Sequence, residues 1–147
     1  MAKTFQTNEM PIYEGLAPGL NAYGQIPNMA WTPKIVAKTA AYTVLASESG
    51  TIFTTVGAAA PVTFTLPAIT DGPYHYVFIC GADYGMTVAA ETADTMLTMN
   101  DLAADSVGFV TAAEMIGGSV EVWCDGTTLI GLARMATEAQ TPTITTA

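Results

Sequence analysis

The side chains that most often perform acid–base or nucleophilic chemistry are scarce in this sequence and lie far apart. The single histidine, His75, stands within the apolar segment 74–80, and the two cysteines are Cys80 and Cys124. His75 and Cys80 are five residues apart, and on a β-strand an odd spacing points two side chains to opposite faces. We therefore expect no thiol–imidazole pair, and we interpret His75 as a hydrogen-bonded or interface histidine.

Ligands for a metal ion or a phosphate group are also sparse. Asp94, Asp101 and Asp105 lack the alternate-residue spacing of a calcium-binding loop. One histidine and two separated cysteines do not build a structural zinc site. Gly117 and Gly118 lack the fingerprint and the following helix of a phosphate-binding loop. We predict that the protein uses no cofactor or metal and is not an enzyme.

The two cysteines each follow an apolar, strand-like run, Val77-Phe78-Ile79 before Cys80 and Val120-Glu121-Val122-Trp123 before Cys124. We expect buried, reduced thiols that pack as small hydrophobic groups. A disulfide between two neighbouring strands stays open as an alternative, because the sequence does not reveal which strands pair.

Composition and charge narrow the class of protein further. Half of the 147 residues are hydrophobic and 12% are charged, which suits one domain with its own core. No apolar run reaches the roughly 20 residues of a membrane-spanning helix, and the N-terminus lacks the apolar stretch of a secretory signal. Between residues 39 and 133 there are ten acids and no Lys or Arg. Such a charge would repel a phosphate backbone, so we expect neither a nucleic-acid nor a membrane partner.

Residues 1–38 differ from the rest of the chain and predict an extended N-terminal arm. Pro11, Pro18, Pro27 and Pro33 recur every six to nine residues, a spacing that excludes a helix of useful length. The segment is nevertheless rich in large apolar side chains. Burying them would not by itself offset the entropy lost on ordering the backbone, so we expect the arm to bind a partner surface by strand addition or by threading between subunits. The alternative is a flexible leader. The predicted contact residues are Phe5, Ile12, Tyr13, Leu16, Leu20, Tyr23, Ile26 and Trp31.

Residues 39–134 predict an all-β domain, a single antiparallel β-sandwich or barrel-like structure. Short β-rich segments alternate there with turn residues, the spacing typical of such folds. In 62–66 the apolar residues Val62, Phe64 and Leu66 alternate with threonines, which predicts one buried face. The predicted strands are 41–45, 51–56, 62–66, 74–80, 86–90, 95–99, 107–111, 119–124 and 127–133.

Three details of this domain are predicted more finely. The strand 74–80 is apolar except for His75, so we expect both of its faces to be covered. Asp125-Gly126 is a favoured pair for a two-residue type I′ hairpin, which would place Val122 opposite Leu129. Residues 135–147 predict a polar C-terminal tail that is mobile or docks on a neighbour.

One stretch of the sequence resembles a β module that recurs in virion proteins of tailed bacteriophages. It begins with KTAAYTVLASESGTIFTTVGAAAPVTFTLP at residues 38–67. It continues with the aromatic strand 74–79, with Gly118-Ser119-Val120, and with Trp123 ahead of Asp125-Gly126. The resemblance covers about two-thirds of the chain, to residue 133. It implies membership of the capsid decoration (cement) proteins, or of the fibre and spike proteins that share the module, and it implies a homotrimer.

The arm favours the cement interpretation, because a fibre would carry a longer repetitive or coiled shaft sequence. The expected role is to bind the outside of the phage capsid and to stabilise the shell by bridging neighbouring subunits of the major capsid protein. The expected location is the capsid surface of the virion, after synthesis in the host cytoplasm. One alternative is a head- or tail-fibre or spike adhesin that binds a host receptor or glycan through exposed aromatic residues such as Tyr84. A second alternative is a barrel that binds a small ligand.

Overall fold

The computed structural model describes residues 33–111 and 115–146, and its contacts divide the chain into two units, 1–32 and 33–147. The description below concerns the second unit, which we call the β domain. No helix among the described residues is long and apolar enough to span a membrane.

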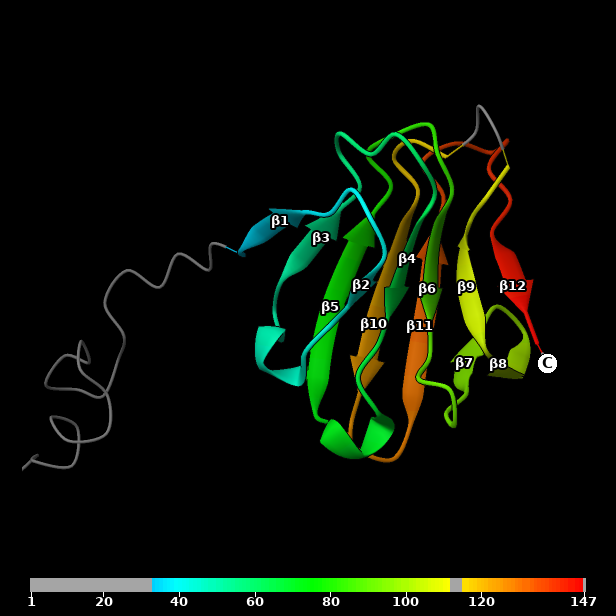
Figure 1. The fold of residues 1–147 in the computed structure, drawn as a ribbon. Helices are drawn as coiled ribbons and strands as arrows, with labels where there is room; N and C mark the ends of the chain where they lie inside the picture. Colours follow the sequence, from blue (N-terminus) through cyan, green and yellow to red (C-terminus); the bar gives the residue numbers. More distant parts are fainter. Residues whose placement is uncertain (1–32, 112–114, 147) are drawn as a thin grey trace, which may run out of the picture. The chain divides into compact units, whose positions relative to one another are not determined.

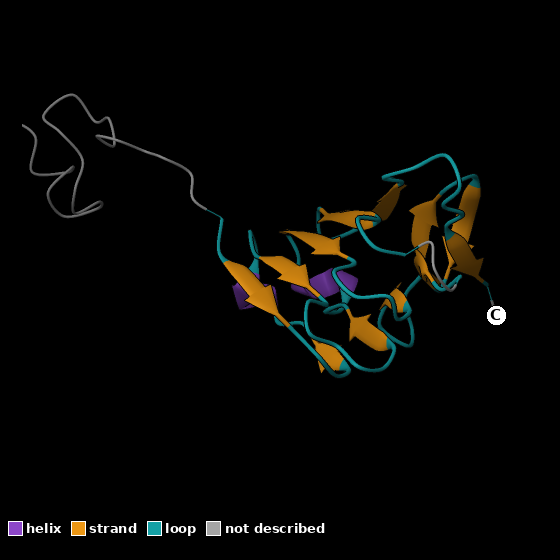
Figure 2. Cartoon of the chain, turned by 90° about the horizontal axis from the view of Figure 1, so that it is seen from above, coloured by secondary structure: helices purple, strands orange, loops and turns teal. Residues whose placement is uncertain are grey.

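The β domain consists of two β-sheets packed face to face, which confirms the predicted all-β sandwich (Figure 1). Seen from above, the sheets form two layers with the connecting loops at their ends (Figure 2). The seven-stranded sheet has the order β1 (Ile35–Ala37), β3 (Ile52–Thr54), β5 (Tyr74–Ile79), β10 (Ser119–Cys124), β11 (Leu129–Arg134), β7 (Met96–Thr98) and β8 (Asp101–Ala104). The five-stranded sheet has the order β12 (Thr143–Thr145), β9 (Ser106–Phe109), β6 (Met86–Ala89), β4 (Val62–Thr65) and β2 (Tyr42–Thr43).

Both sheets are mixed, because the first six strands alternate between the two layers. Each of the first four strands therefore lies beside the strand two places later in the chain and runs in the same direction. From β9 onward antiparallel pairs dominate, notably β5 with β10, β10 with β11, and β6 with β9. The antiparallel pairing that the sequence suggested is thus found mainly in the second half of the domain. In the first half the chain passes back and forth between the two sheets.

Each of the nine predicted strand segments overlaps an observed strand, and three further strands were not predicted. Two of those three lie in segments assigned to other parts of the chain: β1 within the arm 1–38, and β12 within the tail 135–147. The expectation of a mobile or partner-bound tail needs correction here. β12 pairs with β9 of the same chain, Ile144 packs on the core, and the buried Gln140 donates from Nε2 to the Ile116 carbonyl at 3.0 Å.

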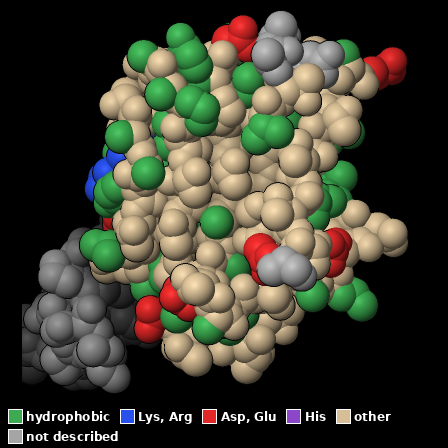
Figure 3. Space-filling model, turned by 45° about the vertical axis from the view of Figure 1, so that its right-hand side comes forward, with side chains coloured by type: hydrophobic (Ala, Val, Ile, Leu, Met, Phe, Trp, Pro, Cys, Tyr) green, Lys and Arg blue, Asp and Glu red, His purple; other side chains and the backbone are tan. Residues whose placement is uncertain are grey.

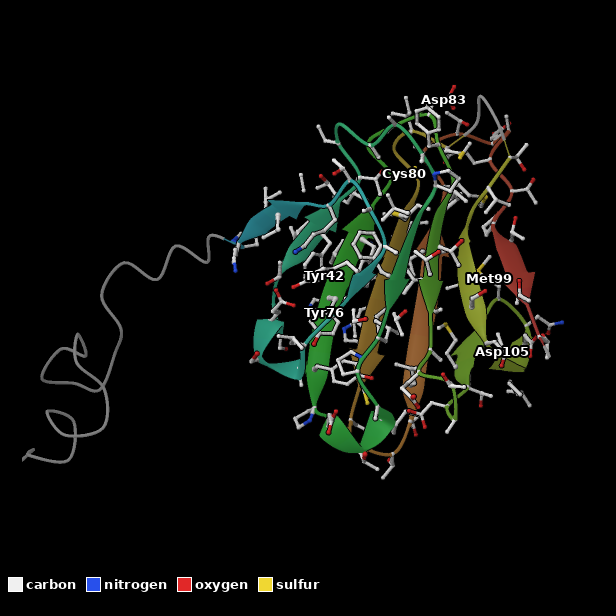
Figure 4. All side chains as sticks on the ribbon, in the orientation of Figure 1. Tyr42, Tyr76, Cys80, Asp83, Met99 and Asp105 are labelled. Carbon is white, nitrogen blue, oxygen red and sulfur yellow. The ribbon has the colours of Figure 1, made fainter. Side chains whose placement is uncertain are left out.

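Aromatic side chains fill the space between the sheets. Phe53 on β3 lies stacked on Phe78 at 5.5 Å between ring centroids, and it also contacts Tyr42 and Phe64 of the opposite sheet, each at 5.8 Å. The interior positions of the tyrosines Tyr42 and Tyr76 can be followed in Figure 4. The Tyr76 hydroxyl donates to the Leu45 carbonyl at 2.8 Å, so this buried polar group is satisfied. Desolvation by burial raises its pKa above the ordinary value.

The β10–β11 hairpin forms where predicted, but its register is shifted by two residues. Val122 pairs with Gly131, and Cys124 pairs with Leu129, so the loop comprises the four residues 125–128. A type I′ turn needs positive φ at both central residues, whereas only Gly126 has it here, with φ 95°. The Asp125 carboxylate instead accepts hydrogen bonds from the backbone N–H groups of residues 127 and 128, at 2.8 and 2.7 Å, and closes the longer loop.

Candidate interaction surface

Strand register decides which side chains of the seven-stranded sheet point away from the core. The outward positions across six of its strands form one continuous surface, which we call the apolar face. Its members are Ile35, Ala37, Ile52, Thr54, His75, Val77, Ile79, Leu97, Ser119, Glu121, Trp123, Ile130, Leu132 and Arg134.

The middle of this face exposes the strand that was expected to be covered on both sides, and that prediction was wrong. On β5 the inward residues Tyr74, Tyr76 and Phe78 are buried, whereas the outward residues 75, 77 and 79 are only partly buried. Neighbouring strands shield the outward side chains laterally, but no second layer of the described residues covers them. The apolar character of β5 therefore reflects a core on one side and a partly solvated surface on the other.

Apolar side chains lie next to one another across the whole width of this face. One cross-strand row runs from Ile35 through Ile52 and Val77 to Leu132, interrupted only by Glu121. The row is most exposed at its ends, with Ile35 at 67% and Leu132 at 38%. Large apolar groups on neighbouring strands and partly open to water are typical of a surface that a partner covers.

Glu121 joins the only charged groups of the apolar face into one network. Its Oε1 lies 3.1 Å from the Nε2 of His75, and its Oε2 accepts a hydrogen bond from Arg134. The His75 ring stacks on Trp123 with 5.5 Å between centroids and 21° between planes. His75 is thus a hydrogen-bonded histidine, as the sequence indicated. The negative charge of Glu121 is offset by Arg134, which leaves the face locally close to neutral.

The outer face of the five-stranded sheet has a different chemistry, and we call it the threonine face. Most of the surface that Figure 3 shows is tan, the colour of the backbone and of side chains that are neither apolar nor charged. No outward position on this sheet holds a large apolar or a charged side chain. The positions are Thr43, Thr63, Thr65, Thr87, Ala89, Ser106, Gly108, Thr143 and Thr145.

The acids of the domain lie mostly in loops, and several of them have structural partners. Asp94 accepts the backbone N–H of Ile69 at 2.8 Å, and Asp101 accepts the Thr146 hydroxyl at 2.6 Å. That bond lowers the pKa of Asp101. An open groove of about 370 Å³ runs past Asp94 and Asp105. No group of three or more potential ligands in the described part of the chain could hold a metal ion.

Both thiols are buried and free, which confirms the sequence interpretation. Cys124 pairs in register with Tyr74 at the start of β5, whereas Cys80 directly follows the end of that strand. Six residues of extended chain span about 20 Å, so the two sulfurs cannot form a disulfide in this fold. Burial raises the pKa of the Cys80 thiol, which disfavours the nucleophilic thiolate form.

The residues predicted to contact a partner through the arm lie outside the described residues. They are Phe5, Ile12, Tyr13, Leu16, Leu20, Tyr23, Ile26 and Trp31. The apolar face was not predicted from the sequence. Its available signals were the outward apolar residues of β5 and the aromatic Trp123 on the neighbouring strand.

No family model matches this chain, and no curated protein and no solved structure matches it at a significant level. Its function is therefore inferred from its own residues and geometry.

Proposed function

We propose that the protein is a non-enzymatic virion component of a tailed bacteriophage that binds the outside of the capsid as a cement protein. In this proposal residues 1–32 contact neighbouring subunits of the major capsid protein, and the β domains associate with one another as a homotrimer. The binding is mechanical, because each copy bridges a joint between shell subunits. Many such copies together resist separation of the subunits through multivalency.

The observation that carries the proposal is that the chain divides into two units and that the second unit has its own core. The β domain has its own aromatic core, with Phe53, Phe64, Tyr76 and Phe78 all fully buried. The contacts separate it from residues 1–32 at Thr32/Pro33. The described residues are thus sufficient to form a packed core, and in this proposal the large apolar residues of the arm serve the partner surface. A surface on a partner gives those residues a place to be buried.

Removal of residues 1–33 tests this function. The truncated chain still begins ahead of β1, so it should keep the β-sandwich and its cooperative thermal unfolding. We expect it to lose binding to expanded capsids in a co-sedimentation assay. A matched full-length variant, Tyr13→Ala with Trp31→Ala, should bind at least tenfold more weakly. Undiminished binding by the truncated chain would remove the arm from the mechanism.

A fibre or spike adhesin is the second candidate, and the position of Tyr84 favours it. Tyr84 is 44% exposed in the loop that follows Cys80, next to Asp83 at one end of the domain (Figure 4). An exposed aromatic ring at the end of a sandwich can stack on a sugar ring. Selective binding of the isolated protein to a glycan array, lost on Tyr84→Ala, would favour the adhesin over the cement protein.

A further inference from the structure

The described β domain is strongly acidic, and its few cations lie on or beside the seven-stranded sheet. Lys34 and Lys38 flank β1, and Arg134 ends β11, so all three belong to the seven-stranded sheet or its edge. Ten acids stand against these three cations in the described residues. They are Glu48, Asp71, Asp83, Glu91, Asp94, Asp101, Asp105, Glu121, Asp125 and Glu138.

This distribution limits how two copies of the chain can approach each other. Copies that meet through their acidic loops repel, because their charges have the same sign. Only the two sheet faces carry little net charge, and the threonine face offers no large apolar group. The apolar face combines local neutrality with apolar side chains on six neighbouring strands.

We propose that the apolar face is the surface through which copies of this chain associate, with Trp123 near the centre of the contact and Glu121 fixed beside it. This assignment rests on the homotrimer in the proposed function and names the surface that builds it. The partner is a second copy of the chain. A neutral, apolar surface lets an acidic molecule approach its own like-charged copy, whereas it offers little to a polyanion.

The arrangement around Trp123 suits the centre of a protein–protein contact. Trp and Arg are enriched among the residues that contribute most to binding, and such residues cluster centrally within a less critical rim. Trp123 is held from one side by the stacked His75 ring, and Arg134 is held by Glu121. Because these side chains already have fixed partners, they lose little conformational entropy when a second copy covers them.

The test measures the oligomeric state of the full-length chain by sedimentation equilibrium over a range of concentrations. We expect the unmodified protein to form oligomers. Leu132→Glu and Ile35→Glu each place a new charge in the proposed contact, and each should weaken association at least tenfold. Both positions are exposed, so both variants should fold, which thermal unfolding checks. Thr63→Glu adds the same charge to the threonine face and should leave association unchanged.

A second measurement reports on the contact directly. In a Trp31→Phe background, Trp123 is the only remaining tryptophan of the chain. Its emission should shift to shorter wavelength as the protein concentration rises, and the shift should be lost in Leu132→Glu. A monomer at all concentrations, association unaffected by both face variants, or association lost equally in Thr63→Glu would each overturn the assignment.

The capsid experiment separates failure of this assignment from failure of the proposed function. Co-sedimentation with capsids depends on residues 1–32 in the proposed function, and self-association depends on the apolar face. An oligomer that responds to the face variants but does not bind capsids supports the surface and sinks the cement function. Binding to capsids together with self-association that is unchanged in the face variants supports the cement function and overturns the assignment of the surface.

Discussion

The apolar face and the threonine face are both formed by the alternate residues that point outward from a strand, but the two surfaces differ in chemistry. In both sheets alternate residues point outward, as in Tyr74–Ile79 of β5 and Val62–Thr65 of β4. Threonine is β-branched and favours strands, so the outward threonines support the sheet while they keep its surface polar. The outward Ile and Val residues of the other sheet contribute the same strand preference. Their apolar character is therefore not needed to form the strand, which supports the association proposed above.

The two faces share one core, so a cavity there should produce the largest effect and should spare neither face. Phe53 contacts aromatic rings of both sheets and is fully buried. We expect Phe53→Ala to lower the free energy of unfolding by about 3–5 kcal/mol, measured by urea denaturation.

Thr63→Val on the threonine face is the control for Phe53→Ala. This exposed substitution keeps the β-branched shape, and we expect a change of about 0.5 kcal/mol or less. If Phe53→Ala had an effect of that small size, the two sheets would not depend on a common core.

A smaller effect should distinguish the two faces themselves. Glu121→Gln keeps the size of the side chain but removes the charge that pairs with Arg134 and His75. Arg134 is two-thirds exposed, so solvent screens the pair, and we expect a loss of about 1 kcal/mol. The matched change on the other face, Thr87→Val, breaks no ion pair.

Urea denaturation in low and high salt tests this difference. The deficit of Glu121→Gln should shrink as salt screens the pair in the unmodified protein, whereas Thr87→Val should show no salt dependence. Equal behaviour of the two variants would mean that the Glu121 network does not stabilise the apolar face.

The sequence was sufficient to predict the strands whose alternation is strong, and it missed three short strands whose local pattern is weak. The segment 62–66 carries three inward apolar residues in a row of alternating positions, and its strand was predicted correctly. β1, β8 and β12 are only three or four residues long. In each of them the pairing with a neighbouring strand, rather than the local pattern, decides that the segment is extended. β12 illustrates this, since Ile144 is its only large apolar residue.

Turn geometry was predicted for the wrong hairpin. The two-residue turn with positive φ at both positions lies at Met99–Asn100, with φ 38° and 72°, between β7 and β8. Asn tolerates this conformation and gave a weak signal, but Met does not, so the sequence did not favour a turn there. At Asp125-Gly126 the expected two-residue turn does not form, because the aspartate side chain makes hydrogen bonds that stabilise a four-residue loop. Turn propensities alone do not predict which of these two loops is more stable.

The apolar face could not be predicted from the sequence for a related reason. The apolar face joins residues from β1 to β11, which are about 100 positions apart along the chain. Only strand order brings Ile35 into one surface with Trp123 and Leu132, and strand order could not be predicted from local patterns. The sequence did indicate that His75 has a hydrogen-bonding partner, but Glu121 could not be identified as that partner.

The smallest expected effect concerns the loop between β10 and β11, which sets the register of the apolar face. The Asp125 carboxylate accepts three hydrogen bonds from residues 127 and 128, which lower its pKa below the ordinary value. A carboxyl group whose pKa falls on folding stabilises the folded state above its unfolded pKa of about 4. That contribution disappears as the pH falls through the lower, folded value.

Asp125→Asn should therefore be slightly less stable than the unmodified protein at pH 7, by less than Glu121→Gln, and the two should converge as the pH falls below about 4. Thermal unfolding across this range measures the difference. Thr127→Val removes only the hydroxyl donor and should show a fraction of the same pH dependence. A constant difference between Asp125→Asn and the unmodified protein at every pH would mean that the carboxylate acts through loop shape and not through its charge. The register of the apolar face would then depend on the positive φ of Gly126 and on strand pairing alone.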